Sequence, residues 1–179
     1  MILNTARAEF SAHGFGGTTM RAIAQAATVD AALIHHFFLS KEGLFTAAVQ
    51  DAFVVPDLVP TVVEGSVERT GERTARAFIT HWETPDVRHR LIGVLRSVMA
   101  FEGAHAALCD FLGSEILQPI TAALGNGKSE LRASLVGSQL IGIALMRYVI
   151  CSEPVVSLRP EQVVFCIADT CQYYLTGRV

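Results

Sequence analysis

The chain has 179 residues, of which 51% are hydrophobic and 17% charged, and its formal net charge is -3 at pH 7. This composition supports one large or two small folded domains and excludes a disordered chain. No basic segment precedes a long apolar run at the N-terminus, and polar residues interrupt the most apolar stretch, residues 131–151. We therefore expect neither a signal peptide nor a membrane span, and a cytoplasmic protein with no membrane partner.

Apolar residues recur at helical spacing over residues 2–13, which we expect to form a helix that ends at Gly14. Two short helices follow, over residues 20–27 and 31–38. Thr18 or Thr19 can cap the first and Asp30 the second, because a side-chain oxygen there accepts a hydrogen bond from a free first-turn amide. The turn between them passes through Thr28 and Val29. Two short helices joined in this way predict a helix-turn-helix.

The helix over residues 31–38 has two different sides. At 100° per residue, Leu33, Ile34, Phe37 and Phe38 fall on one side, which we expect to face the core. The opposite side carries the small or hydrogen-bonding residues Ala31, Ala32, His35 and His36. Such a surface is typical of a helix that enters the major groove of DNA. The alternative is a pair of solvated surface histidines.

Ser40 is positioned to cap a further helix that runs to about residue 54. Lys41 lies in its first turn and is the strongest single candidate for a phosphate contact, with an ordinary solvated lysine as the alternative. The first 50 residues balance Arg7, Arg21 and Lys41 with three acidic residues, so formal charge does not favour DNA binding here.

The spaced residues of this segment resemble the N-terminal domain of TetR-family transcriptional regulators over roughly 50 residues. The resemblance rests on Ile2, Leu3, Ala6, Phe10, Gly14, Thr18, Thr19, Ile23, Ala24, Val29, Phe38, Ser40, Lys41 and Leu44. It implies an all-helical homodimeric repressor that binds an operator in double-stranded DNA and responds to a small-molecule effector. Thr28 stands where the family usually has Gly, Asp30 where it has a small hydroxyl residue, and His35 where it has Tyr. A threonine at a position that needs positive φ predicts strain.

The expected fold is therefore all-α, with an N-terminal three-helix DNA-binding domain that contains the helix-turn-helix over residues 1–54. A larger helical ligand-binding and dimerisation domain is expected over residues 55–179, with the boundary near Pro56. The DNA-contact candidates are Thr18, Thr19, Arg21, Thr28, Asp30, Ala31, Ala32, His35, His36 and Lys41.

The remaining residues predict short helical pieces over 57–71 and helices over 72–82, 85–101, 104–124, 129–150 and 160–176. The last two are apolar around most of their circumference, which favours a subunit interface in a four-helix bundle over an internal core alone. The dimer-interface candidates are Leu135, Ser138, Gly142, Val164, Ile167, Cys171 and Tyr174. The candidates for a pocket that binds an apolar or amphipathic effector are His81, Trp82, Arg96, Met99, Phe101, His105, Phe111, Met146 and Arg147.

Two other classes of function remain open. An enzyme, or a thiol or metal sensor, depends on His105 and Cys109, which are four residues apart, but no third metal ligand and no catalytic motif accompanies them. We therefore expect no catalysis, no cofactor and no metal site, and four reduced, mostly buried cysteines. The second rival is a dimeric helical interaction module without sequence-specific DNA binding, which the neutral N-terminal segment favours.

Overall fold

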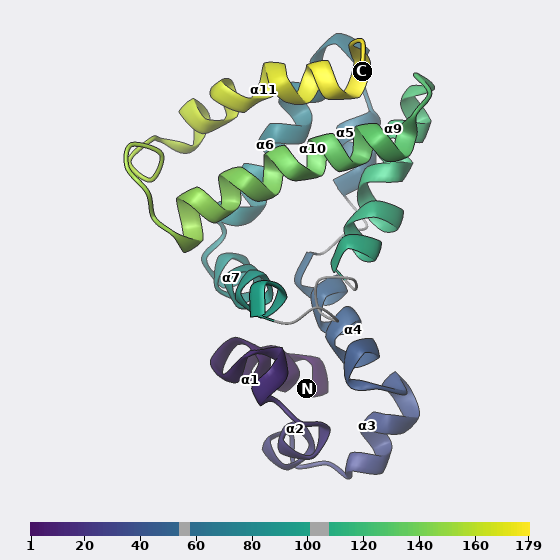
Figure 1. Ribbon diagram of the computed structural model, residues 1–179, viewed down its shortest axis with the longest axis vertical. Coiled ribbons are helices and arrows are strands. Elements are labelled where there is room, and N and C mark those ends of the chain that lie inside the picture. The colour runs from purple at the N-terminus through teal and green to yellow at the C-terminus, as the bar shows by residue number, and fades with distance from the viewer. Residues whose placement is uncertain (54–57, 101–107) are drawn as a thin grey trace. The chain divides into compact units, whose positions relative to one another are not determined.

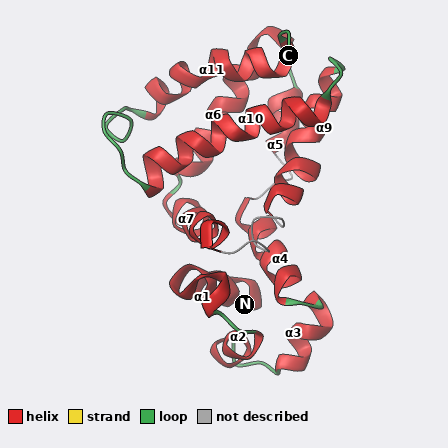
Figure 2. Ribbon diagram, viewed as in Figure 1, coloured by secondary structure: helices red, strands yellow, loops and turns green. Residues whose placement is uncertain are grey.

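The computed structural model describes residues 1–53, 58–100 and 108–179, and all regular secondary structure in these ranges is helical (Figures 1 and 2). The all-α prediction is confirmed. The chain forms two compact units: Met1–Phe53 with His89–Phe111, and Val54–Arg88 with Leu112–Val179. The predicted boundary near Pro56 lies outside the described residues.

The first unit contains α1 (Ile2–Gly17), α2 (Met20–Ala26), α3 (Ala31–Phe38), α4 (Lys41–Phe53) and the part of α7 (Pro85–Ala100) that begins at His89. Its core is an aromatic cluster. The rings of Phe10 and Phe15 stack at a centroid distance of 5.6 Å, and Phe45 of α4 meets both edge-on at 5.2 and 5.3 Å. These three rings fix α4 against α1.

Two further contacts join helices within this unit. Arg7 of α1 forms an ion pair with Asp51 of α4, and burial together with the nearby Arg90 lowers the pKa of the Arg7 guanidinium. A Cβ added to Gly93 of α7 would lie 2.7 Å from the Cβ and Oγ of Ser11 on α1. Only a glycine therefore allows α7 to approach α1 this closely.

The second unit consists of α5 (Leu58–Val63), a 3-10 turn η2 (Val67–Arg69), α6 (Thr70–Glu83), a π-helical segment η3 (Leu112–Leu117), α9 (Gln118–Leu124), α10 (Ser129–Ala144), a π-helical segment η4 (Leu145–Val149), α11 (Pro160–Thr176) and the start of α7. The short helical pieces predicted before residue 71 are present as α5 and η2. The helix predicted over 104–124 was expected to bend or break near Gly113 and Pro119, and the π-helical segment η3 includes Gly113. The helix predicted over 129–150 instead ends in a second π-helical segment, η4.

The helices α6 and α11 approach each other closely at Gly71. A Cβ there would lie 2.4–2.6 Å from backbone atoms of Ala168 and Gln172 on α11. The Gly71 amide also donates a hydrogen bond of 2.7 Å to Oε1 of Gln172. This contact explains why α11 can bury Val164, Ile167 and Cys171 against the rest of the unit.

A buried polar cluster joins α6 to η4. Oε1 of Glu83 accepts hydrogen bonds from Nε and Nη2 of Arg147, at 3.2 and 3.0 Å, and from the Tyr148 hydroxyl at 3.0 Å. The Tyr148 ring stacks on Trp82 at 4.9 Å. Burial lowers the pKa of Arg147, but its hydrogen bonds with Glu83 and Tyr148 outweigh this and raise the pKa above its ordinary value. The cluster therefore holds the buried Arg147 cation against a carboxylate.

Within the described residues, no helix is both long and apolar enough to cross a membrane. The expectation of mostly buried cysteines is wrong: Cys109, Cys151 and Cys166 are exposed, and Cys171 alone among the four is buried. The same part of the chain holds no group of three or more His, Cys, Asp or Glu side chains that could bind a metal ion.

Candidate nucleic-acid interface

Side-chain caps begin α2, α3 and α4, and all three were predicted. Oγ1 of Thr19 accepts a hydrogen bond of 3.1 Å from the Ala22 amide, and Oδ1 of Asp30 accepts one of 2.8 Å from the Ala32 amide. Oγ of Ser40 does the same for Gly43 at 3.0 Å. Each cap satisfies an amide that has no partner within its helix, so the three short helices have defined starting points.

The turn between α2 and α3 is a Schellman motif. The amide of Thr28 donates to the Gln25 carbonyl at 3.1 Å, and the amide of Val29 donates to the Ala24 carbonyl at 2.9 Å. Thr28 stands at the left-handed position with φ 55°. Glycine is usual there, so the predicted strain is present in the turn that sets the angle between the two helices.

One open concavity of about 670 Å³ brings together five of the predicted DNA-contact residues. Its lining consists of Met20, Arg21, Ala31, Ala32, His35, His36 and Leu39. The side chains of Arg21, Ala32, His35 and His36 are exposed, and Ala31 is half-buried. Small residues with two imidazoles on an exposed helix face leave room for a base edge and supply hydrogen-bonding atoms for it.

Thr18, one of the predicted DNA contacts, has a different role from the one expected. Thr18 is only 1% exposed, and its hydroxyl donates to the carbonyls of Gly14 at 2.8 Å and Glu9 at 3.1 Å. It therefore cannot reach a phosphate, and its assignment as a DNA contact is wrong. Thr18 instead closes the end of α1, where helix carbonyls have no partners of their own.

Lys41 makes contacts inside the unit that the sequence analysis did not anticipate. Its Nζ donates to the carbonyls of Phe15 at 2.9 Å and Thr18 at 3.0 Å, and lies 4.3 Å from the centroid of the Phe15 ring. The first turn of α4 places this ammonium at the C-terminal end of α1, where free carbonyls and the helix dipole favour a cation. Lys41 thus joins α4 to the end of α1.

The largest error of prediction concerns the core face of α3. Ile34 is buried as expected, but Leu33 is 42% and Phe37 is 64% exposed. Four apolar residues spread over about 140° of an eight-residue helix are more than its contacts with α2 and α4 can cover. The roughly 140° spread of these apolar residues is the signal that could have predicted the exposure. A narrower apolar stripe, centred on Ile34 and Phe38, would be enough to face the core.

The predicted effector-pocket residues that the structure describes are divided between the two units. Trp82 and Arg147 belong to the cluster with Glu83 and Tyr148, and Met146 is exposed, so a place for Met146 in a pocket stays a prediction. His81 lies half-buried next to Trp82 in the second unit. In the first unit, Arg96 is exposed and Phe111 is buried, and their place in an effector pocket stays a prediction. The side chain of Met99 and the whole of Phe101 and His105 lie outside what the structure describes.

The predicted dimer residues also divide. Val164, Ile167 and Cys171 are buried within their own unit and have no surface left to offer a partner, so their assignment is wrong. Tyr174 and Leu135 are half-buried, whereas Ser138 and Gly142 are exposed. The error has a physical cause: a helix that is apolar all round does not show from its sequence which side faces its own core.

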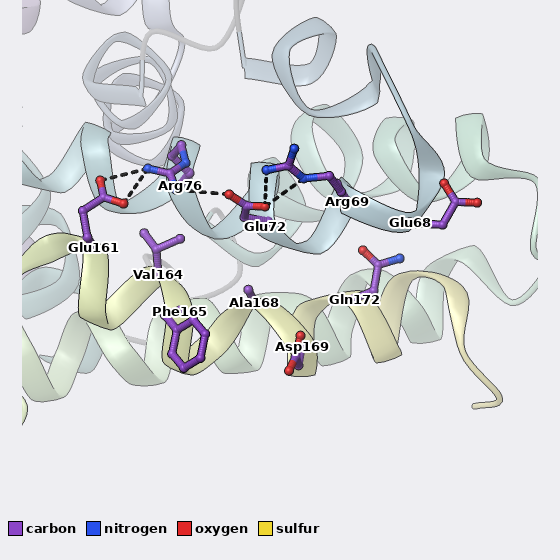
Figure 3. Close-up of a pocket in the computed structure, with 10 residues that line it drawn as sticks. All are labelled: Glu68, Arg69, Glu72, Arg76, Glu161, Val164, Phe165, Ala168, Asp169 and Gln172. Carbon is purple, nitrogen blue, oxygen red and sulfur yellow. Dashed lines mark hydrogen bonds and ion pairs between the residues drawn. The ribbon is translucent and has the colours of Figure 1, made fainter.

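A groove of about 360 Å³ runs between α6 and α11 in the second unit (Figure 3). A chain of ion pairs lines it: Glu161 of α11 binds Arg76 across the groove at 2.7 Å, and along the α6 side Arg76 binds Glu72 and Glu72 binds Arg69, at 3.1 and 2.8 Å. Phe165 stands on its rim with 83% of its surface exposed. The Glu161–Arg76 pair joins α11 to α6, and with Glu68 and Asp169 the lining has more carboxylates than guanidinium groups.

Comparison with known proteins gives matches over both units. Residues 2–48 match the family described as bacterial regulatory proteins, tetR family, and residues 68–175 match the family described as tetracyclin repressor-like, C-terminal domain. No curated protein sequence matches the chain.

Solved structures give the same result. A TetR-family regulator from Streptomyces coelicolor has 30% sequence identity and a TM-score of 0.78, covering 97% of this chain and 92% of that one. PfmR, a TetR-family transcriptional regulator from Thermus thermophilus, has 21% identity and a TM-score of 0.59, covering 97% and 96% of the two chains, and so shows similarity of fold.

Proposed function

The chain belongs to the TetR family of bacterial transcriptional regulators, and from this premise we propose that it is a repressor that binds a palindromic operator as a homodimer and is released by a small apolar or amphipathic effector. The observation that carries the proposal is the exposed face of α3 beside α2. The two helices are capped and joined by a short turn, and the exposed face of α3 carries small residues and two imidazoles. This arrangement is typical of a helix that enters the major groove.

We assign the contacts to DNA by position on this face. Ala32 and His36 are exposed on α3 and are placed to meet base edges, with His35 beside them. Arg21 and the exposed Thr19 of the α2 segment are placed to meet phosphates. Asp30 uses its carboxylate to cap α3, which leaves the first-turn amides of α3 less available to a phosphate than in a helix with a neutral cap. Sequence preference is therefore expected to come from α3 and general affinity from α2.

The exposed faces of α10 and α11 support the homodimer. Leu131, Ser138 and Gly142 form a stripe of apolar and small residues on the outside of α10, and Phe165 and Tyr173 are exposed on α11. Small residues let helices approach closely, and exposed aromatic side chains are enriched at protein interfaces. We propose that these outward faces, in place of the buried residues Val164, Ile167 and Cys171, form the interface.

The exposed thiol of Cys166 provides a test of this interface, because it follows Phe165 on the outside of α11. If the interface forms there, a thiol reagent should modify Cys166 more slowly as the protein concentration rises through the dimer dissociation constant. Cys151, which is exposed in the segment between η4 and α11, is the matched control and should react at the same rate throughout. If the chain dimerises but both cysteines are modified at rates that do not depend on protein concentration, the interface lies elsewhere.

We further propose that the effector binds among the helices around Trp82. The indole ring is 1% exposed, and its Nε1–H has no hydrogen-bond partner among the described residues. A buried donor without an acceptor costs free energy, so a ligand that brings an oxygen to this atom gains a hydrogen bond without displacing another. An effector that binds one conformation better than the other shifts the population away from the DNA-competent form.

The first experiment is quantitative binding of the full chain to DNA from upstream of its own gene and neighbouring genes, with random DNA as the control, across a salt series. The proposal predicts preference for one palindromic segment and an affinity that falls as salt rises. A ligand screen on that segment then tests effector release. Dimerisation without any preference over random DNA would contradict the proposal and favour the interaction-module alternative.

A further inference from the structure

The recognition helix α3 exposes more apolar surface than a groove-facing helix needs for its own packing. Leu33, Phe37 and the following Leu39 are 42%, 64% and 73% exposed, while Ile34 alone in this helix is fully buried. The eight residues of α3 include neither Lys nor Arg. The part of the helix that faces outward is therefore mainly apolar, with two imidazoles as its polar groups.

These apolar side chains continue the proposed DNA-contact face. At 100° per residue, Ala32 and His36 mark the middle of the exposed arc, and Leu33 and Phe37 lie on the side of it away from α2. Leu33 and Phe37 are four residues apart and so lie one above the other on that side. The Phe37 ring contacts the His36 ring edge-on at a centroid distance of 5.3 Å. The apolar pair is thus continuous with the residues placed against base edges.

The major groove of DNA offers one apolar group to such a pair. Hydrogen-bond donors and acceptors line the groove, and the C5-methyl group of thymine is the exception. Phosphates, the other neighbours of a groove-bound helix, gain nothing from Leu or Phe. We infer that Leu33 and Phe37 recognise thymine methyl groups, so that the operator carries thymines at the positions they face; this inference rests on the proposed function of operator binding.

The size of the effect follows from the area involved. Burial of one methyl-sized apolar group changes an equilibrium constant about fourfold. Removing the methyl group of a thymine that Leu33 or Phe37 contacts should therefore lower the affinity of the protein for the duplex about fourfold. A thymine elsewhere in the operator should show no change.

The test uses duplexes that differ only in that methyl group. The full chain first selects its preferred duplex from a library with a random core. The selected duplex is then remade with deoxyuridine in place of thymidine, one position at a time, and binding of the unmodified chain, Leu33→Ala and Phe37→Ala is measured. Val67→Ala is the matched control, since Val67 is 49% exposed in η2 of the other unit. Far-UV circular dichroism checks that each variant is folded.

We expect deoxyuridine to weaken binding of the unmodified chain and of Val67→Ala at the same positions. Phe37→Ala and Leu33→Ala should each lose the effect at their own positions while binding the deoxyuridine duplex nearly as before. Two outcomes would overturn the inference and leave the operator-binding proposal standing. The first is that the unmodified chain binds the thymidine and deoxyuridine duplexes with equal affinity. The second is that Leu33→Ala and Phe37→Ala lower the affinity for both duplexes equally, or for neither. A failure to select any sequence would overturn both the inference and that proposal.

Discussion

Replacing Glu83 with glutamine should strongly destabilise the second unit. The substitution keeps the shape of the side chain but removes the charge that faces Arg147, whose side chain is only 8% exposed. Arg147 would keep the carbonyls of Val155 and Val156, at 2.8 and 3.1 Å, as its remaining acceptors. Loss of one partner from a buried ion pair costs about 3–5 kcal/mol. Because the Glu83 side chain is 28% exposed and water can partly replace it, we expect about 3 kcal/mol.

The assay is reversible unfolding by heat and by urea. A loss of about 3 kcal/mol corresponds to a fall in Tm of roughly 6–12 °C in a chain of this length. Glu130→Gln, on the exposed first turn of α10, is the control and should change the free energy of unfolding by less than about 0.5 kcal/mol. In the double variant with Arg147→Met the loss should be smaller than the sum of the single losses. Glu83→Gln as stable as Glu130→Gln would refute the reasoning.

Three further outcomes follow from individual residues. Thr28→Gly removes the strain of the positive φ but adds conformational entropy to the unfolded chain. The net effect should raise the free energy of unfolding by about 0.5–1 kcal/mol, measured by urea unfolding. A lower stability would show that Thr28 is not strained. Burial raises the pKa of Tyr148 and of the Cys171 thiol to about 12, from 10.0 and 9.0. The folded chain therefore keeps protons that the unfolded chain releases, so stability should fall as pH rises from about 9 toward 12, and less steeply in Cys171→Ala; parallel pH profiles would contradict this. Gly71→Ala forces α6 away from α11 and should cost about 3 kcal/mol in thermal unfolding, and a change below about 1 kcal/mol would mean that the helices separate freely.

The sequence predicted the local structure of the N-terminal helices well because short-range chemistry determines it. Thr19 and Asp30 cap the helices that their side chains were expected to cap, and Thr28 adopts the positive φ that its place in the turn demands. Each of these features depends on atoms within a few residues, so the amino-acid pattern contains the information needed.

Features that depend on distant parts of the chain could not be predicted in the same way. The exposure of Leu33 and Phe37 depends on how much of α3 its neighbouring helices cover, and the contacts of Lys41 span 26 and 23 residues along the chain. The burial of Ile167 depends on which side of α11 faces its own unit. The sequence does not reveal that side, because the helix is apolar around most of its circumference. Periodicity identifies a helix more readily than it identifies the direction in which that helix faces.

The contacts of Lys41 have a mechanical consequence. One ammonium group holds two carbonyls at the end of α1 and rests on the Phe15 ring, while that ring also packs against Phe45 on the same helix as Lys41. Two attachments about one turn apart on α4 resist both sliding and twisting of α4 against α1, because packed interiors transmit strain. A displacement applied to α4 would therefore turn α1 with it, and the α2–α3 elbow that follows α1 would move as part of the same rigid body.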